Sequence, residues 1–178
     1  MMQTRRLFTT TVVFAATAAM ACAQRPSPAA QTSATIAGKK ITINYSAPSV
    51  RGRKIFGEDG LIRNDSTYPV WRAGANEATS LETAGNLTIG DLKVPAGKYT
   101  LFVLLDKAGW KLIVNKQTGQ GGLDYDEKQD LVRVPMKMAK TPALVETYKM
   151  TLAPTGGNKG RLTLEWENTS ASVDFTVQ

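Results

Sequence analysis

The sequence contains no histidine, and its only cysteine is Cys22. Without histidine the chain cannot form the Ser–His or Cys–His pairs that activate nucleophiles, a near-neutral imidazole base, or the His-rich sites that bind zinc, copper and iron. A single cysteine near the N-terminus also excludes internal disulfides and cysteine cages for zinc or iron–sulfur clusters. Any catalysis would therefore depend on carboxylate, Lys, Tyr or Ser groups, and no cofactor is predicted.

Residues 1–23 have the features of an export signal. Arg5 and Arg6 precede an apolar stretch at 7–21, and small residues follow it. The apolar stretch is too short and too weakly hydrophobic to remain in a membrane, so no transmembrane span is predicted. The Arg pair resembles a twin-arginine signal, and both general and twin-arginine export stay open.

Two processing sites compete at the end of this signal. Cleavage after Ala23, at Ala21-Cys22-Ala23, would release a soluble protein. A lipobox-like match that ends at Cys22 would instead give a lipoprotein, although it lacks the usual large apolar residue three positions before the cysteine. In both cases the domain is predicted to be periplasmic or extracellular.

Charge gives little indication of a partner. The chain carries a net charge of +7, and without Arg5 and Arg6 there remain 20 basic residues against 15 acidic ones, a mild +5. The densest basic group is Arg51, Arg53 and Lys54, and the other basic residues are scattered. Binding of nucleic acid is therefore not predicted.

Residues 24–33 are rich in Pro, Ser and Ala and show no hydrophobic period. This composition predicts a short flexible tether. The remaining residues, 34–178, are predicted to form one domain of ordinary size, large enough to bury roughly two-thirds of its unfolded surface.

Alternation of apolar and polar residues predicts short strands through this domain. The pattern is clearest at 148–152, 162–166 and 173–177. Residues 99–105 are apolar on both faces, which is typical of a central strand. Gly90-Asp91 predicts a tight hairpin, and Pro135 confines the strand at 131–134 to an edge or an end.

These features predict an all-β domain, an antiparallel β-sandwich or jelly roll of about nine to ten strands, with helix essentially only in the signal peptide. A closed barrel is the alternative. The long irregular loops at 46–70 and 116–130 favour the sandwich, because they suit strands that cross between two sheets.

Several motifs in order along the chain resemble the DUF2911 family of exported bacterial proteins. The resemblance extends from about residue 36 to 177 and rests on Y-S-A-P-S-V-R-G-R-K-I-F-G at 45–57, V-W-R-A-G-A-N-E-A-T at 70–79, P-A-G-K-Y-T-L-F at 95–102, N-K-Q-T-G-Q at 115–120, Y-D-E-K at 125–128 and W-E-N-T at 166–169. It implies no activity, because the family has no assigned function. The chain departs from the family pattern at Gln120-Gly121-Gly122, where an aromatic residue is expected, and at Thr67-Tyr68-Pro69.

The segment 70–79 concentrates polar side chains in a Gly/Ala-rich stretch that is not typical of a strand. In one interpretation Trp71 closes the end of the core, while Arg72 and Glu77 neutralise each other. In the other, Trp71, Arg72, Asn76 and Glu77 form the rim of a binding pocket in which Arg72 takes an anion. If basic loop residues met at one end of the sandwich, they would extend this site. The candidate ligand-binding residues are Arg51, Arg53, Lys54, Trp71, Arg72, Asn76, Glu77, Asn115, Lys116, Gln120 and Tyr125.

Carboxylate side chains suggest two further candidate sites. Asp124, Asp126, Glu127 and Asp130 are spaced closely enough to offer calcium ligands, although the spacing is not that of an EF-hand. For a glycosidase-like pair, Glu165 or Glu167 would act with Glu77 or Glu82, at a separation of about 5 to 10 Å.

Three tryptophans, Trp71, Trp110 and Trp166, could line a sugar-binding groove. The alternation at 162–166 nevertheless places Trp166 on the core side of its strand. The favoured function is a non-catalytic exported domain that binds a small polar or anionic ligand, or a component of the cell envelope, through its loop end. The alternative is a carboxylate-dependent glycan hydrolase or a carbohydrate-binding module.

Overall fold

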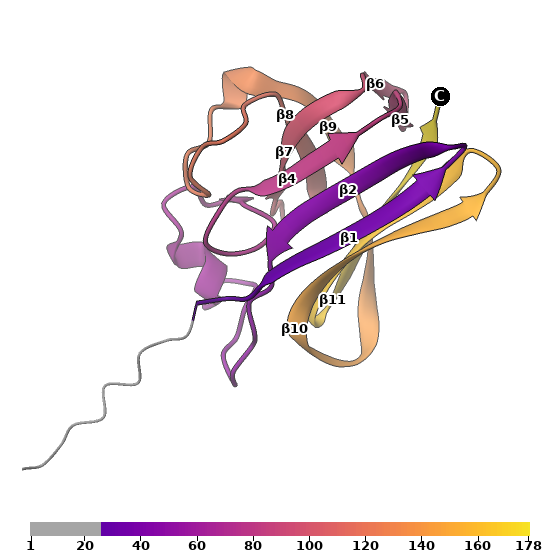
Figure 1. Cartoon of the computed structure of the whole chain (residues 1–178). Coiled ribbons are helices and arrows are strands. Elements are labelled where there is room, and N and C mark those ends of the chain that lie inside the picture. Colours follow the sequence, from indigo (N-terminus) through magenta and orange to yellow (C-terminus); the bar gives the residue numbers. More distant parts are fainter. Residues whose placement is uncertain (1–25) are drawn as a thin grey trace, which may run out of the picture.

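The computed structural model describes residues 26–178, which form two antiparallel sheets packed face to face (Figure 1). This confirms the predicted antiparallel β-sandwich, whereas the export signal predicted at 1–23 lies outside the described residues. In the larger sheet the order is β1 (Ala29–Ile36), β2 (Lys39–Ser46), β4 (Thr79–Thr83), β7 (Gly97–Leu104), β8 (Lys111–Asn115) and β9 (Asp130–Pro135), with β3 (Val70–Trp71) paired to β7. In the smaller sheet it is β10 (Lys137–Gly156), β11 (Lys159–Val177), β5 (Leu87–Ile89) and β6 (Leu92–Val94).

Helix is scarce in this part of the chain. Two short 3-10 helices, η1 (Leu61–Asn64) and η2 (Glu127–Gln129), lie in the long loops that the sequence predicts at 46–70 and 116–130. No helix within residues 26–178 is long and apolar enough to cross a membrane.

Strand β7 is central in the larger sheet, as its apolar sequence predicts. Leu101 and Val103 point into the main core between the sheets, while Phe102 faces outward and is buried under the 116–130 loop. β9, which ends at Pro135, lies at the edge of the larger sheet, where a proline costs no ladder hydrogen bond.

The predicted flexible tether at 24–33 is wrong for its second half. Residues 29–33 belong to β1 and pair with β2, from Ala29 opposite Ser46 to Ser33 opposite Thr42. The Thr32 hydroxyl also accepts a hydrogen bond from the Leu152 amide, 3.1 Å away, across the junction of the two sheets. The turn at Ala37-Gly38 predicts pairing of residues 34–36 with the next strand, but small polar residues give no hydrophobic period that would show the strand extending to residues 29–33.

The strands predicted at 162–166 and 173–177 are two arms of β11, which reverses direction between them. Arg161 and Asp174 are in contact at 2.6 Å, although a straight strand would separate them by roughly 43 Å. Asn158 likewise bonds to Val177. Both contacts centre on Glu167–Asn168, and Glu167 has φ of 57°, the left-handed conformation found in tight turns. β10 pairs with both arms, through residues 149–156 and 137–140.

The core lies between the sheets and is rich in aromatic rings at the loop end of the sandwich. Trp71 stacks on Trp166 with ring centres 5.9 Å apart, and Tyr148 packs edge-on against Trp71 at 5.1 Å. Trp71 and Trp166 are 1% and 3% exposed. The prediction that Trp166 lies in the core is confirmed.

Candidate functional site

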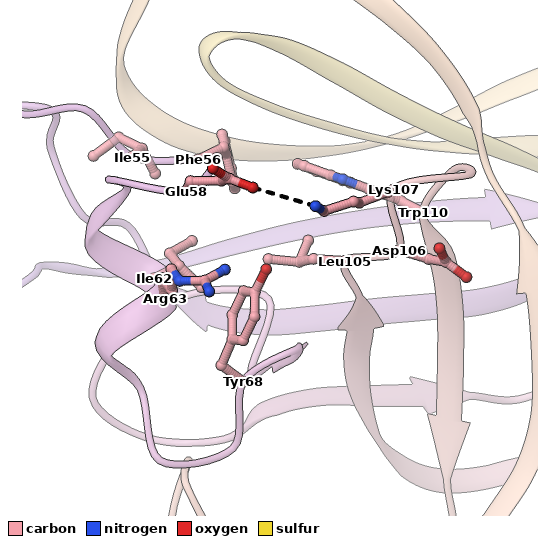
Figure 2. A pocket seen from close by; sticks show the side chains of 11 residues that line it. Ile55, Phe56, Glu58, Ile62, Arg63, Tyr68, Leu105, Asp106, Lys107 and Trp110 are labelled. Carbon is pink, nitrogen blue, oxygen red and sulfur yellow. Dashed lines mark hydrogen bonds and ion pairs between the residues drawn. The ribbon is translucent and has the colours of Figure 1, made fainter.

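A cavity of about 150 Å³ opens at the loop end, between the connection from β2 to β3 and the turn from β7 to β8 (Figure 2). We call it the Arg63 pocket. It is lined by Ile55, Phe56, Gly57, Glu58, Ile62, Arg63, Tyr68, Leu105, Asp106, Lys107 and Trp110.

The chain from 54 to 63 forms a compact loop that fixes one side of this pocket. The amides of Leu61 and Ile62 donate to the carbonyls of Lys54 and Ile55, at 3.0 and 3.3 Å. Gly60 allows this closure, because a Cβ at that position would lie 2.4 Å from the Ile55 carbonyl oxygen. Since Ile55 and Ile62 are both buried, the loop is anchored to the core and Arg63 is held at its edge.

The inner walls of the pocket are apolar. Phe56 packs against Trp110 with ring centres 4.7 Å apart, and also contacts Trp71 and Trp166 at 5.7 and 5.9 Å. Phe56 and Trp110 are only half-buried, so both rings present a face to the cavity as well as to the core. Burial of an apolar group against these rings would be favourable.

The polar groups converge on one side of the cavity. The Arg63 guanidinium lies 5.3 Å from the centre of the Tyr68 ring, and Figure 2 shows it beside the Tyr68 hydroxyl, directed toward the cavity. Within residues 26–178, neither the guanidinium nor this hydroxyl makes a side-chain hydrogen bond or ion pair. Both are therefore free to donate to a ligand.

The remaining charges at the mouth are already satisfied. Lys107 pairs with Glu58 at 3.2 Å (Figure 2). The Asp106 carboxylate accepts from the Ala108 amide at 3.0 Å and points away from the cavity. Among the described residues that line the pocket, Arg63 and Asp106 are the charges without an ion-pair partner, and of these two only Arg63 is directed toward the cavity.

The segment 70–79, weighed as the rim of a binding pocket, is largely held by contacts within the protein. The Trp71 indole donates to the Gly74 carbonyl at 3.0 Å. Arg72 is held by Asp65, at 3.2 Å, and by the Asn76 carbonyl, also at 3.2 Å. The carboxylate predicted to hold Arg72 is thus present, but it is Asp65, whereas Glu77 forms an isolated backbone bridge with Gly121.

The basic residues predicted to extend this site do not converge on one cavity. Arg53 donates to the carbonyls of Ser49 and Val50, at 2.7 and 3.0 Å. Lys54 pairs with Asp59 at 3.5 Å, and Arg51 and Lys116 are exposed. None of these four residues lines the Arg63 pocket.

Asn115 and Tyr125 hold the 116–130 loop against the larger sheet. Asn115 donates to Asp130 at 2.8 Å, and the Tyr125 hydroxyl donates to the other oxygen of Asp130 at 2.7 Å. Arg133 donates to Asp130 and to the Tyr125 hydroxyl, at 2.6 and 2.7 Å. Burial, together with Asp130, raises the pKa of Tyr125. These polar groups are saturated by one another.

The four carboxylates considered as calcium ligands make hydrogen bonds or ion pairs that hold the same loop. Asp124 accepts from the Gly121 amide, Asp126 from the Lys128 amide, and Glu127 pairs with Arg133. No three acidic residues between 26 and 178 are grouped in a way that could hold a metal ion. The structure therefore does not bring these four carboxylates together as a calcium site.

The carboxylates weighed for glycoside hydrolysis lie on opposite sides of the sandwich. Glu165 pairs with Lys149 on the outer face of the smaller sheet, and Glu82 pairs with Lys98 on the outer face of the larger one. Glu167 lies at the reversal of β11, where its carboxylate accepts from the Ile55 amide at 3.4 Å. The structure does not place these residues across a common cleft.

Arg63, Tyr68 and Lys107 are site residues that were not predicted from the sequence. Arg63 lies in the short 3-10 helix η1 and the other two lie in turns, where no period marks which side chains point inward. The only signals were the Thr67-Tyr68-Pro69 departure from the family pattern, and Trp110, which was weighed as part of a groove. Gln120, the remaining candidate, lines a second hollow on the larger sheet.

A family model described as "Protein of unknown function (DUF2911)" matches residues 27–175. The match begins just before β1 and covers both sheets and all residues of the Arg63 pocket. No curated protein and no solved structure matches the chain.

Proposed function

The chain belongs to the DUF2911 family, whose function is unknown, and we propose from the geometry of the Arg63 pocket that it is a non-catalytic binding domain for a small carboxylate-bearing molecule with an apolar body. The observation that carries this proposal is the convergence of Arg63 and Tyr68 on one side of a cavity whose inner walls are apolar.

The size of the cavity supports a ligand with one ring or a short branched chain. A protein cavity of about 150 Å³ is known to accept benzene. Phe56 and Trp110 would contact the apolar body, and exclusion of water from their faces would supply most of the binding free energy.

The polar side of the pocket supports a carboxylate. A guanidinium presents its donors in a planar fork that matches two carboxylate oxygens, and the Tyr68 hydroxyl adds a further donor. Glu58 and Lys107 pair with each other and Asp106 points away from the cavity, so Arg63 is the charge that faces the cavity and favours a carboxylate there.

Calorimetric titration of the purified protein with benzoate, phenylacetate and the neutral analogue benzamide tests this proposal. We expect the carboxylates to bind and benzamide to bind more weakly. Arg63→Gln should weaken carboxylate binding by roughly 10- to 100-fold, the value of a hydrogen bond to a charged group. Arg63→Lys should recover only part of this loss, because it keeps the charge without the fork.

Arg161→Gln provides the matched control, because Arg161 lies on the outer face of the smaller sheet and pairs there with Asp174. It should bind benzoate as the unaltered protein does. Equal binding of benzoate and benzamide, or equal losses in Arg63→Gln and Arg161→Gln, would contradict the proposal.

We also propose that the domain works outside the cytoplasm, as the Arg5-Arg6 and apolar pattern of residues 1–23 supports. Fractionation of cells that express the full chain, together with the mass of the processed N-terminus, tests this. A cytoplasmic product that retains residues 1–23 would contradict it.

A further inference from the structure

The outer face of the larger sheet has a covered half and an open half. The 116–130 loop covers Val70, Phe102 and Ile113, which form a small apolar cluster with Tyr125 packed on it. Beside the edge of this loop, the open half forms a groove of about 410 Å³. This groove is distinct from the Arg63 pocket and shares no lining residue with it.

A row of uncharged polar side chains crosses the open half. Gln31 donates to Asn44 at 2.6 Å, and Asn44 donates to Ser80 at 3.4 Å. On the other side of the groove Gln120 donates to Thr100 at 3.0 Å. The row passes over β1, β2, β4 and β7, neighbouring strands that together span roughly 14 Å.

The wall of the groove contains an acceptor without a partner. Gln120 uses its amide nitrogen on Thr100, while its side-chain oxygen is buried and has no hydrogen-bond partner among residues 26–178. A buried acceptor of this kind is unfavourable unless a donor satisfies it. Because this oxygen is buried, a ligand hydroxyl would reach it only if the Gln120 side chain turned toward the groove.

The charges along the groove do not favour an anionic ligand. Lys98 and Glu82 pair with each other at 3.8 Å and are largely exposed, and the lining adds the exposed carboxylate of Glu77. The only aromatic residue of the lining, Tyr99, has its ring in the core and donates its hydroxyl to the Pro95 carbonyl. Binding would therefore depend on hydrogen bonds to amides and hydroxyls, which both donate and accept.

We propose that this groove binds a neutral, hydroxyl-rich chain molecule, an oligosaccharide, laid across the strands. Sugar hydroxyls both donate and accept hydrogen bonds, as do the side chains of Asn44, Ser80 and Gln120. An oligosaccharide carries enough hydroxyls to contact several side chains along this row. Because no ring stacks on the sugar, affinity is low and independent of salt.

The test is a titration of the labelled protein, followed by amide NMR shifts, with soluble oligomers of glucose, xylose and N-acetylglucosamine. We expect shifts at Ser80 and Gln120 for at least one oligomer, with none at Arg63. Asn44→Ala and Ser80→Ala should each weaken that binding about fivefold, the value of one hydrogen bond. Thr42→Ala is the matched control, because Thr42 faces the same side of β2 but does not line the groove.

Three outcomes would overturn the proposal. The first is the absence of groove shifts with every oligomer, and the second is an equal loss in Thr42→Ala. The third is concentration-dependent shifts without sugar, which would assign this face to contact with a second copy of the chain. Benzoate binding at the Arg63 pocket is measured separately, so failure of one proposal leaves the other standing.

Discussion

Arg72 and Arg63 belong to neighbouring loops, yet their guanidinium groups have opposite environments. Arg72 has a side chain only 15% exposed and is tied to Asp65 and to the Asn76 carbonyl. Arg63 is exposed, stacks on Tyr68 and faces a cavity. The first arginine closes the fold, whereas the second is available to a ligand.

The comparison shows that a concentration of polar residues does not by itself mark a binding site. In the 70–79 segment most polar groups have an internal partner, and the Asn76 amide, for example, donates to the Ser27 carbonyl at 3.0 Å. The exceptions among the described residues are the Arg72 Nε, which is buried, and the Glu77 carboxylate, which is exposed. In the Arg63 pocket the groups that remain unpartnered are few, but they share one opening. Four experiments would break or sharpen this distinction, and they follow from the largest expected effect to the smallest.

Replacement of the buried indole should have the largest effect. Trp71→Ala removes a side chain that is 1% exposed and contacts Phe56, Tyr148 and Trp166. We expect a loss of about 3–5 kcal/mol in the free energy of unfolding, measured with urea. Trp110→Ala, at the half-buried wall of the pocket, should cost clearly less. Equal losses would mean that the pocket wall is as much a part of the core as Trp71.

Truncation within the N-terminal region should cause the next largest loss of stability. Removal of residues 1–25 leaves β1 complete, whereas removal of residues 1–33 deletes most of its pairing with β2 and the acceptor at Thr32. With a net value of roughly 0.5–1.5 kcal/mol for each hydrogen bond, the longer truncation should lose about 2–4 kcal/mol. Similar melting temperatures for both truncated proteins would mean that residues 26–33 add no stability, as the predicted flexible tether requires.

The two arginines should differ in stability as well. Arg72→Ala leaves the partly buried Asp65 carboxylate without its partner, so we expect a loss of about 1–3 kcal/mol. Arg63→Ala removes an exposed side chain and should change the free energy of unfolding by less than about 0.5 kcal/mol. Urea titration of both variants measures these losses. A larger loss of stability in Arg63→Ala than in Arg72→Ala would mean that Arg63, and not Arg72, holds the fold.

The fold was largely predictable because period-two alternation depends on burial, and burial leaves a pattern in the sequence. The alternation at 162–166 and 173–177 located both arms of β11, and the apolar run at 99–105 located the central strand. The first part of β1, residues 29–33, escaped prediction because its stability comes from backbone pairing, which small residues such as Ala30 and Ser33 allow but do not signal.

The pocket was not predictable for a related reason. Arg63 and Lys107 approach one cavity from loops far apart in the sequence, and neither loop has a period. The sequence indicated which side chains could bind an anion, including Arg72. It could not show that Asp65 occupies Arg72 and leaves Arg63 unpaired, because that outcome depends on how two irregular segments close over the core.

The smallest expected effect concerns the Tyr148 hydroxyl, which lies beside Trp71. This hydroxyl is buried and has no hydrogen-bond partner among residues 26–178, so it contributes little to the free energy of unfolding at neutral pH. Tyr148→Phe should therefore change the free energy of unfolding at pH 7 by less than about 0.5 kcal/mol, or raise it slightly. A loss above about 1 kcal/mol would reveal an acceptor for the hydroxyl.

Alkaline pH makes the same substitution more informative. Burial raises the pKa of Tyr148, so the folded protein keeps this hydroxyl protonated while the unfolded chain ionises near pH 10. The unfolded state then binds fewer protons than the folded state, and stability falls as the pH rises through about 10, by roughly 1.4 kcal/mol at pH 11 relative to pH 7. Tyr148→Phe lacks this loss, so urea titrations at pH 7 and pH 11 should show the variant gaining on the unaltered protein. Parallel pH curves would mean that the hydroxyl reaches solvent, and that the aromatic cluster around Trp71 is open toward the Arg63 pocket.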